Sequence, residues 1–171
     1  MPKNDTSTFA LCLRAARIRA GYHKTGDAAL HVPISQSVIG RHERGEVRAA
    51  PEDVLVYAKV YAAPELPMRY CRMTCPIGRR MMDDIQDREL AELAARAYNR
   101  LKAAPHIAEM LTEIADDGLI DSQERPLFDQ IVQKVREYRT LADELELLAA
   151  KLKMPKAPGP AEAHRQKQYV G

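Results

Sequence analysis

The stretch SQSVIGRHERG, residues 35–45, decides the predicted fold of this 171-residue chain. Ser35 is a good N-cap because its hydroxyl can accept a hydrogen bond from a free N–H of the first helical turn. Gly45 is a natural stop, since glycine adopts the left-handed conformation that ends many helices. The polar side chains able to reach outward share one face of this short helix: Gln36, Ser37 and Arg41. Ile34, His42 and either Val38 or Ile39 fall towards the other face.

Further short helices with tight turns surround this stretch. A helix is predicted behind the N-caps Thr6, Ser7 and Thr8, and it ends before Gly21. A second runs from about Thr25 to His31 and is stopped by Pro33, because the residue before a proline disfavours helical backbone. A fourth begins at Pro51, and one or two turns follow from Pro64 to about Arg69. The sequence thus predicts a five-helix domain over residues 8–67.

Composition favours helices over the rest of the chain. Hydrophobic residues make up 46%, charged residues 29% and aromatic residues only 5%, with 8 Gly. Many Ala, Leu, Glu and Arg residues and few β-branched runs predict an all-α fold and argue against a sandwich, a barrel or a parallel-sheet enzyme. We expect a connector at 68–86, a helical oligomerisation domain at 87–154, and a disordered, proline-rich tail at 155–171.

The domain at 87–154 carries three apolar helical patterns. The first ends before Pro105, the second ends at Asp117-Gly118, and the third runs from Pro126 to Lys153. A capping box of Asp121 and Glu124 is expected to begin the third helix. Its apolar residues recur at spacings of three and four, which predicts a helical bundle or coiled coil that forms a homodimer. The predicted dimer seam is Ile131, Val135, Tyr138, Leu145 and Leu152.

Charge is divided unevenly along the chain, although the net charge is only +2. Residues 1–80 hold 13 Lys/Arg and 7 Asp/Glu, a net charge of +6. Residues 81–154 hold 10 Lys/Arg and 16 Asp/Glu, a net charge of −6. This asymmetry favours contact of the first half with a polyanion; scattered solvated charge is the alternative.

Two motifs in the first half resemble a known family. They are Leu13-Arg14-x-x-Arg17-x-x-x-Gly21 and Ser35-x-Ser37-x-Ile39-x-Arg41-x-Glu43-x-Gly45, followed by a helix with Leu55, Ala58 and Lys59. In this order and spacing they resemble the repressor/Cro-type (XRE-like) helix-turn-helix domains of phages and bacterial regulators, over about residues 8–67. In such domains the second helix of the motif lies in the major groove of DNA.

The resemblance implies a role for individual residues. Base contacts are expected from Gln36, Ser37 and Arg41, and a structural ion pair from Arg17 with Glu43. The residues expected to contact phosphate are Thr25, Lys24, Arg44 and Arg48.

The expected function is therefore DNA-binding transcription regulation in the cytoplasm. The chain is expected to be a dimeric repressor that reads double-stranded DNA at a palindromic operator; the resemblance implies a phage-like or mobile-element operon. A different class remains open: an antitoxin or adaptor whose C-terminal helices bind a partner protein.

Other functional classes have little support in the sequence. Cys71 and Cys75 are spaced to share a helix face, where they could bind a metal, form a redox pair or simply pack. No second cysteine or histidine pair completes a zinc site, so no metal or cofactor is expected. We find no nucleophile elbow, P-loop or H-E-x-x-H motif, and expect no enzyme and no catalytic residue. No apolar run reaches the ~18 residues of a membrane span, so no membrane contact is expected.

Overall fold

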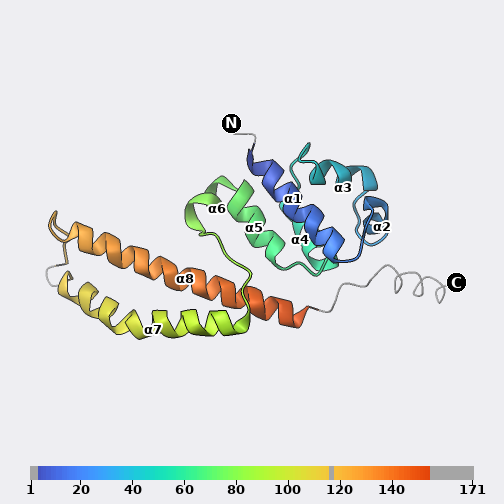
Figure 1. Cartoon of the computed structure of the whole chain (residues 1–171). Helices are drawn as coiled ribbons and strands as arrows, with labels where there is room; N and C mark the ends of the chain where they lie inside the picture. The colour runs from blue at the N-terminus through green and yellow to red at the C-terminus, as the bar shows by residue number, and fades with distance from the viewer. Residues whose placement is uncertain (1–3, 116–117, 155–171) are drawn as a thin grey trace. The chain divides into compact units, whose positions relative to one another are not determined.

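The computed structural model describes residues 4–115 and 118–154. Within these residues every regular element is a helix and no strand occurs, so the all-α prediction is confirmed. The helices, labelled in Figure 1, are α1 (Asn4–Arg19), α2 (Thr25–Ala29), α3 (Gln36–Glu43), α4 (Pro51–Val60), α5 (Glu65–Thr74), α6 (Pro76–Met81), α7 (Leu90–Glu113) and α8 (Arg125–Lys153). The predicted tail at 155–171 lies outside the described residues.

The chain divides into two compact units. Of the described residues, 4–82 and 150–154 belong to unit 1, and 83–149 belong to unit 2. Unit 1 therefore contains α1 to α6, and unit 2 contains α7 and most of α8.

Unit 1 is built around α5. This helix packs against α1, α4 and α6, while α3 packs against both α1 and α2. Their buried side chains form one hydrophobic core. The largest fully buried side chains of this core are Tyr22, Tyr57, Leu13, Ile39, Leu66 and Val54.

The helices after α4 differ from the sequence prediction. α5 continues to Thr74, well beyond Arg69, because Leu66 and Tyr70 lie one turn apart and are both buried. The predicted connector at 68–86 thus contains the end of α5 and all of α6.

The prediction that a helix ends before Pro105 is wrong, since α7 runs through this residue to Glu113. A proline inside a helix loses only its own N–H bond and pushes on the preceding turn. Pro105 is exposed, and the inward residues Leu93 and Ile114 on either side of it are buried. Burial along both halves of α7 therefore outweighs one missing hydrogen bond.

Unit 2 is an antiparallel hairpin of α7 and α8. Arg100 of α7 donates from Nη1 to the carbonyl of Glu137 at 2.8 Å, and Tyr138 donates its hydroxyl to the carbonyl of Arg100 at 2.6 Å. The predicted capping box starts α8: Asp121 N–H donates to Glu124, whose own N–H donates to the Asp121 carboxylate at 2.9 Å.

A buried carboxylate closes the other end of the hairpin. Glu144 is 2% exposed and accepts hydrogen bonds from the Arg88 guanidinium and the Gln86 N–H, both at 3.1 Å. Arg96 of α7 lies 3.5 Å from its second oxygen. These contacts attach the segment before α7 to α8, because a carboxylate buried without such partners would be strongly destabilising.

The predicted seam residues of α8 do not share one environment. Ile131 is buried within the hairpin and the Tyr138 hydroxyl bonds to α7. Val135, Leu145 and Leu152 are exposed. The seam is thus divided between the inner and outer faces of α8, because α8 buries a different stripe in its second half, which includes Leu141, Glu144 and Leu147.

A buried ion pair joins α1 to α3. Arg17 Nε and Nη2 donate to the two carboxylate oxygens of Glu43 at 2.7 and 2.8 Å, and each side chain is 5% exposed. Arg17 Nη1 also donates to the carbonyl of Tyr22 in the turn before α2. The hydrogen bond to Glu43 raises the pKa of Arg17 above its ordinary value. One guanidinium thus fixes α1, α3 and the turn before α2 in one arrangement.

A buried histidine lies on the inner side of α3. His42 Nδ1 lies 3.0 Å from the hydroxyl oxygen of Tyr57 in α4, and the two rings meet edge to face. Burial lowers the pKa of His42, because the charged imidazolium loses its hydration there. The neutral ring is therefore the form that the folded domain favours.

We predict that removing Glu43 alone is far more damaging than removing both partners. Glu43→Leu should lower the free energy of unfolding by about 3–5 kcal/mol, because it leaves the Arg17 cation buried and unpaired. The double variant Arg17→Met with Glu43→Leu should regain much of that loss. Urea denaturation of both variants measures the difference, and equal losses in the two would contradict this account.

We also predict a pH dependence that comes from His42. Its folded-state pKa lies below the unfolded value of about 6.5, so its contribution to stability is complete above pH 6.5. Between the unfolded-state pKa and the lower folded-state pKa, the unfolded chain takes up a proton and the folded chain does not. The contribution of His42 to stability is therefore lost as the pH falls through the folded-state pKa. The urea midpoints at pH 7.5 and 5.5 should differ more for the wild type than for His42→Gln. If the difference is the same in both proteins, His42 is not the source of the pH dependence.

Candidate functional site

The ends of α3 are fixed by its own sequence. Ser35 Oγ accepts a hydrogen bond from the Val38 N–H at 3.4 Å, so Ser35 is the N-cap. Gly45 has a φ of 68°, the left-handed conformation that lets the chain turn away after the helix. These two residues define a helix of two turns with its first residues at the surface.

The outer face of α3 is polar and its inner face is buried. Gln36, Ser37 and Arg41 are exposed, as the sequence predicts. Ile39 is fully buried in the core of unit 1, and His42 follows it one turn later. Three different hydrogen-bonding side chains are thus presented on a short, well-anchored helix.

α2 lies beside the start of α3. Thr25 is its first residue, and the preceding Lys24 is exposed, with its N–H bonded to the Asp27 carboxylate at 3.0 Å. A Cβ added at Gly26 would lie 3.3 Å from Gln36 Oε1. The Gln36 amide therefore rests over the first turn of α2, in a space that a glycine leaves open.

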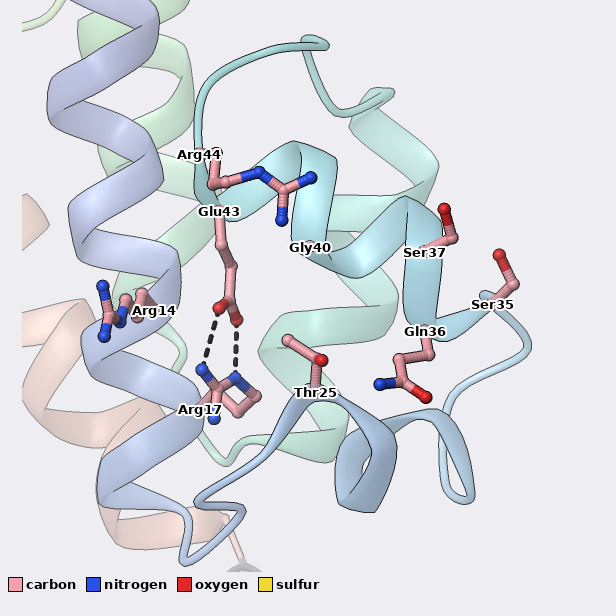
Figure 2. A pocket seen from close by; sticks show the side chains of 9 residues that line it. All are labelled: Arg14, Arg17, Thr25, Ser35, Gln36, Ser37, Gly40, Glu43 and Arg44. Carbon is pink, nitrogen blue, oxygen red and sulfur yellow. Dashed lines mark hydrogen bonds and ion pairs between the residues drawn. The ribbon is translucent and has the colours of Figure 1, made fainter.

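An open groove of about 800 Å³ lies where α1, α2 and α3 meet, as Figure 2 shows. Its lining comprises Arg14, Arg17, Thr25, Ser35, Gln36, Ser37, Gly40, Glu43 and Arg44. Three of these residues are arginines, and the one carboxylate, Glu43, is neutralised by Arg17. The groove thus presents hydroxyl and amide groups beside the cations of Arg14 and Arg44, an arrangement suited to an anion.

Arg44 is already engaged by a neighbouring carboxylate. Its guanidinium donates to both oxygens of Glu46, at 2.6 and 3.0 Å, and both residues are exposed. The hydrogen bond with Arg44 lowers the pKa of Glu46, so this carboxylate is charged at neutral pH. The Arg44 guanidinium also crosses Gly40, where an added Cβ would lie 2.9 Å from Nη1. Arg44 must therefore release the Glu46 carboxylate before its guanidinium can bind another anion.

Arg48 is held away from the groove. Its Nε donates to the Tyr70 hydroxyl at 3.1 Å, and its guanidinium carbon lies 5.4 Å from the centre of that ring. Tyr70 in turn donates to the carbonyl of Ala49 at 2.9 Å. Of the predicted contact residues, the groove thus gathers Thr25, Gln36, Ser37 and Arg44, while Lys24, Arg41 and Arg48 lie outside its lining.

Two residues of the site were absent from the sequence-based list. Arg14 has a detectable signal, because it precedes Arg17 by three residues and so lies on the same side of α1. Glu46 has none, since the turn at Gly45 is what brings its carboxylate to Arg44.

The cysteines do not form a metal site in the described part of the chain. Cys12, Cys71 and Cys75 are all free thiols, and no group of three or more potential ligands occurs among the described residues. Cys75 lies between α5 and α6, where the N–H groups of Gly78 and Ile77 lower its pKa.

Comparisons with protein-family models, with curated proteins and with solved structures found no match. Among the described residues, no helix combines the length and the apolar character that crossing a bilayer requires. The surface of α3 and the groove beside it are therefore the features of the chain that bear on its function.

Proposed function

We propose that this chain is a sequence-specific DNA-binding transcriptional regulator that acts as a dimeric repressor and reads the major groove with α3. The observation that carries the proposal is the exposed set Gln36, Ser37 and Arg41 on a helix whose other face is buried. An α-helix with its side chains is about 10–12 Å in diameter, which fits the major groove of about 12 Å width.

The chemistry of this face suits base edges. Glutamine can bind adenine through two hydrogen bonds, and arginine can bind guanine in the same bidentate way. No acidic side chain is exposed on α3, since Glu43 is buried against Arg17. The face therefore offers specific donors and acceptors without repelling phosphates.

The groove supplies contacts to the DNA backbone. Arg14, Thr25 and Arg44 line it, and Lys24 is exposed beside Thr25. Phosphate contacts of this kind hold a reading helix in register and carry no sequence information. With the reading helix and the backbone contacts on adjacent elements, α2 and α3 act together as a helix-turn-helix.

Dimerisation is assigned to the C-terminal helices. One small module contacts few bases, and a second copy on a two-fold-symmetric operator raises affinity through effective concentration. Half-sites about 34–36 Å apart follow from the pitch of DNA. Val135 and Leu145 are exposed and available to a second chain.

We predict that Arg41→Ala relaxes sequence preference at one base pair of each half-site. A pool of random duplexes is bound and sequenced at two salt concentrations, with Arg136→Ala at an exposed position of α8 as the matched control. The wild type and the control should enrich the same two-fold site, and Arg41→Ala should lose about 1–3 kcal/mol of discrimination at one position.

Weak binding that is equal across sequences and disappears with salt would contradict this assignment, because only phosphate attraction would remain. The exposed apolar residues of unit 2 would then favour the second candidate, an antitoxin or adaptor that binds a partner protein.

We predict that Glu46 weakens DNA binding by occupying Arg44. Glu46→Gln should raise the affinity for DNA several-fold, because it frees the Arg44 guanidinium to bind a phosphate. The affinity should also fall more steeply with salt, by the amount that about one additional phosphate contact contributes. Glu52→Gln removes the same charge from an exposed position in α4 and serves as the control. Equal gains in both variants would show that only the net charge matters.

A further inference from the structure

The two sides of the α7–α8 hairpin differ in chemistry. On α7, the inward residues Leu93, Ala97 and Arg100 are each followed by an apolar residue, namely Ala94, Tyr98 and Leu101. On α8, the inward residues Leu141 and Glu144 are followed in the same way by Ala142 and Leu145. Each helix thus carries a second apolar stripe next to the one that it buries.

Both second stripes lie on the same side of the hairpin. Arg96 meets Glu144 and Arg100 meets Glu137, so α7 and α8 run antiparallel. Both helices are right-handed, and each residue turns about 100° from the one before it. In an antiparallel pair, the positions that follow the inward residues therefore turn to the same side on both helices. We call this the apolar side; its residues are Leu90, Ala94, Tyr98, Leu101, Val135, Ala142 and Leu145.

The large residues of the apolar side are open to solvent. Leu90 is 66% exposed, Tyr98 67% and Leu101 61%, and on α8 Val135 is 52% and Leu145 40% exposed. The Lys102 ammonium lies 6.0 Å from the centre of the Tyr98 ring. A continuous apolar face of this kind marks an interaction surface.

The opposite side of the hairpin is polar. The residues that precede the inward positions there are mainly Glu92, Arg96, Asn99, Thr140 and Asp143. Within the hairpin, Arg96 forms an ion pair with Glu144 and Thr140 donates a hydrogen bond to Asp83. Only the apolar side is therefore suited to a dry contact.

Charge decides which occupant fits the apolar side. Residues 83–149 hold 8 Lys/Arg and 16 Asp/Glu, a net charge of −8. This charge repels nucleic acid, and it repels a second copy over most of the surface. The apolar residues named above carry none of this charge, and the charged side chains beside them, Lys102 and Arg139, are cations. A second copy that approaches there therefore avoids the acidic surface.

The size of the apolar side suits a dimer. From Leu90 to Leu101, and from Val135 to Leu145, the stripes run about 15 to 17 Å along the helices. Two helices packed about 8–10 Å apart make a face about 20 Å wide. Such a face is isologous: when two copies meet across a two-fold axis, each supplies the same pair of ridges to the other.

We propose that two copies of this chain pack their apolar sides together, so that α7 and α8 of each copy form a four-helix bundle. In this arrangement α7 supplies half of the interface. The dimer seam predicted from the sequence lies on α8 alone and does not include α7. The proposal rests on the proposed function only in that a two-fold operator requires two copies.

Sedimentation velocity of the full chain tests the proposal. The wild type should sediment as a dimer of the 19.2 kDa chain at micromolar concentration. Leu101→Glu should weaken the dimer at least ten-fold, because it places a carboxylate within the apolar interface. Asn99→Glu adds the same charge on the polar side and should leave the dimer unchanged. Helical circular dichroism confirms folding, and Tyr98→Lys replaces Leu101→Glu if that variant unfolds.

A wild-type chain that remains monomeric at 100 µM, or a folded Leu101→Glu chain that still dimerises as the wild type does, would overturn the proposal. Binding of the same variants to a single half-site duplex is measured in parallel. Leu101→Glu should keep half-site binding while losing dimerisation. Loss of sequence-specific binding in the wild type would count against the proposed function and not against the bundle.

Discussion

The buried pair of Arg17 with Glu43 is the interaction on which the candidate site depends. It joins α1 to α3, and the same guanidinium holds the carbonyl of Tyr22 in the turn that leads to α2. The floor of the groove is therefore fixed by charge-assisted hydrogen bonds as well as by the core. It also removes an acidic side chain from a surface that is proposed to approach phosphate, because Glu43 is neutralised where it lies.

Around this floor, the site separates two kinds of contact. The outer face of α3 carries uncommitted hydrogen-bonding groups, while the cations that line the groove lie on α1 and at the end of α3. Arg44 is the exception, since it is held by Glu46 and passes over Gly40. A glycine inside a helix costs up to about 1 kcal/mol relative to alanine. In α3, Gly40 leaves space for the Arg44 guanidinium. The residue that weakens the helix therefore also allows this cation to lie over it.

Local signals predicted much of unit 1, and long-range packing accounts for what they missed. The cap at Ser35, the stop at Gly45 and the start of α4 at Pro51 are encoded by single residues, and the structure has all three. The Arg17–Glu43 contact came from a resemblance, since no spacing rule joins residues 26 apart. The continuation of α7 through Pro105 and the division of the α8 seam depend on what each helix buries, which a single sequence does not contain.

The central claim is that α3 is the surface that meets DNA. Titration of a mixed-sequence duplex into the ¹⁵N-labelled full chain, followed by amide chemical shifts at low salt, tests it most directly. The account predicts that the largest shifts occur at residues 24–26 and 35–44, with little change at residues 90–113 of α7. Shifts that concentrate on α7 and α8, or that are absent at α3, would contradict it.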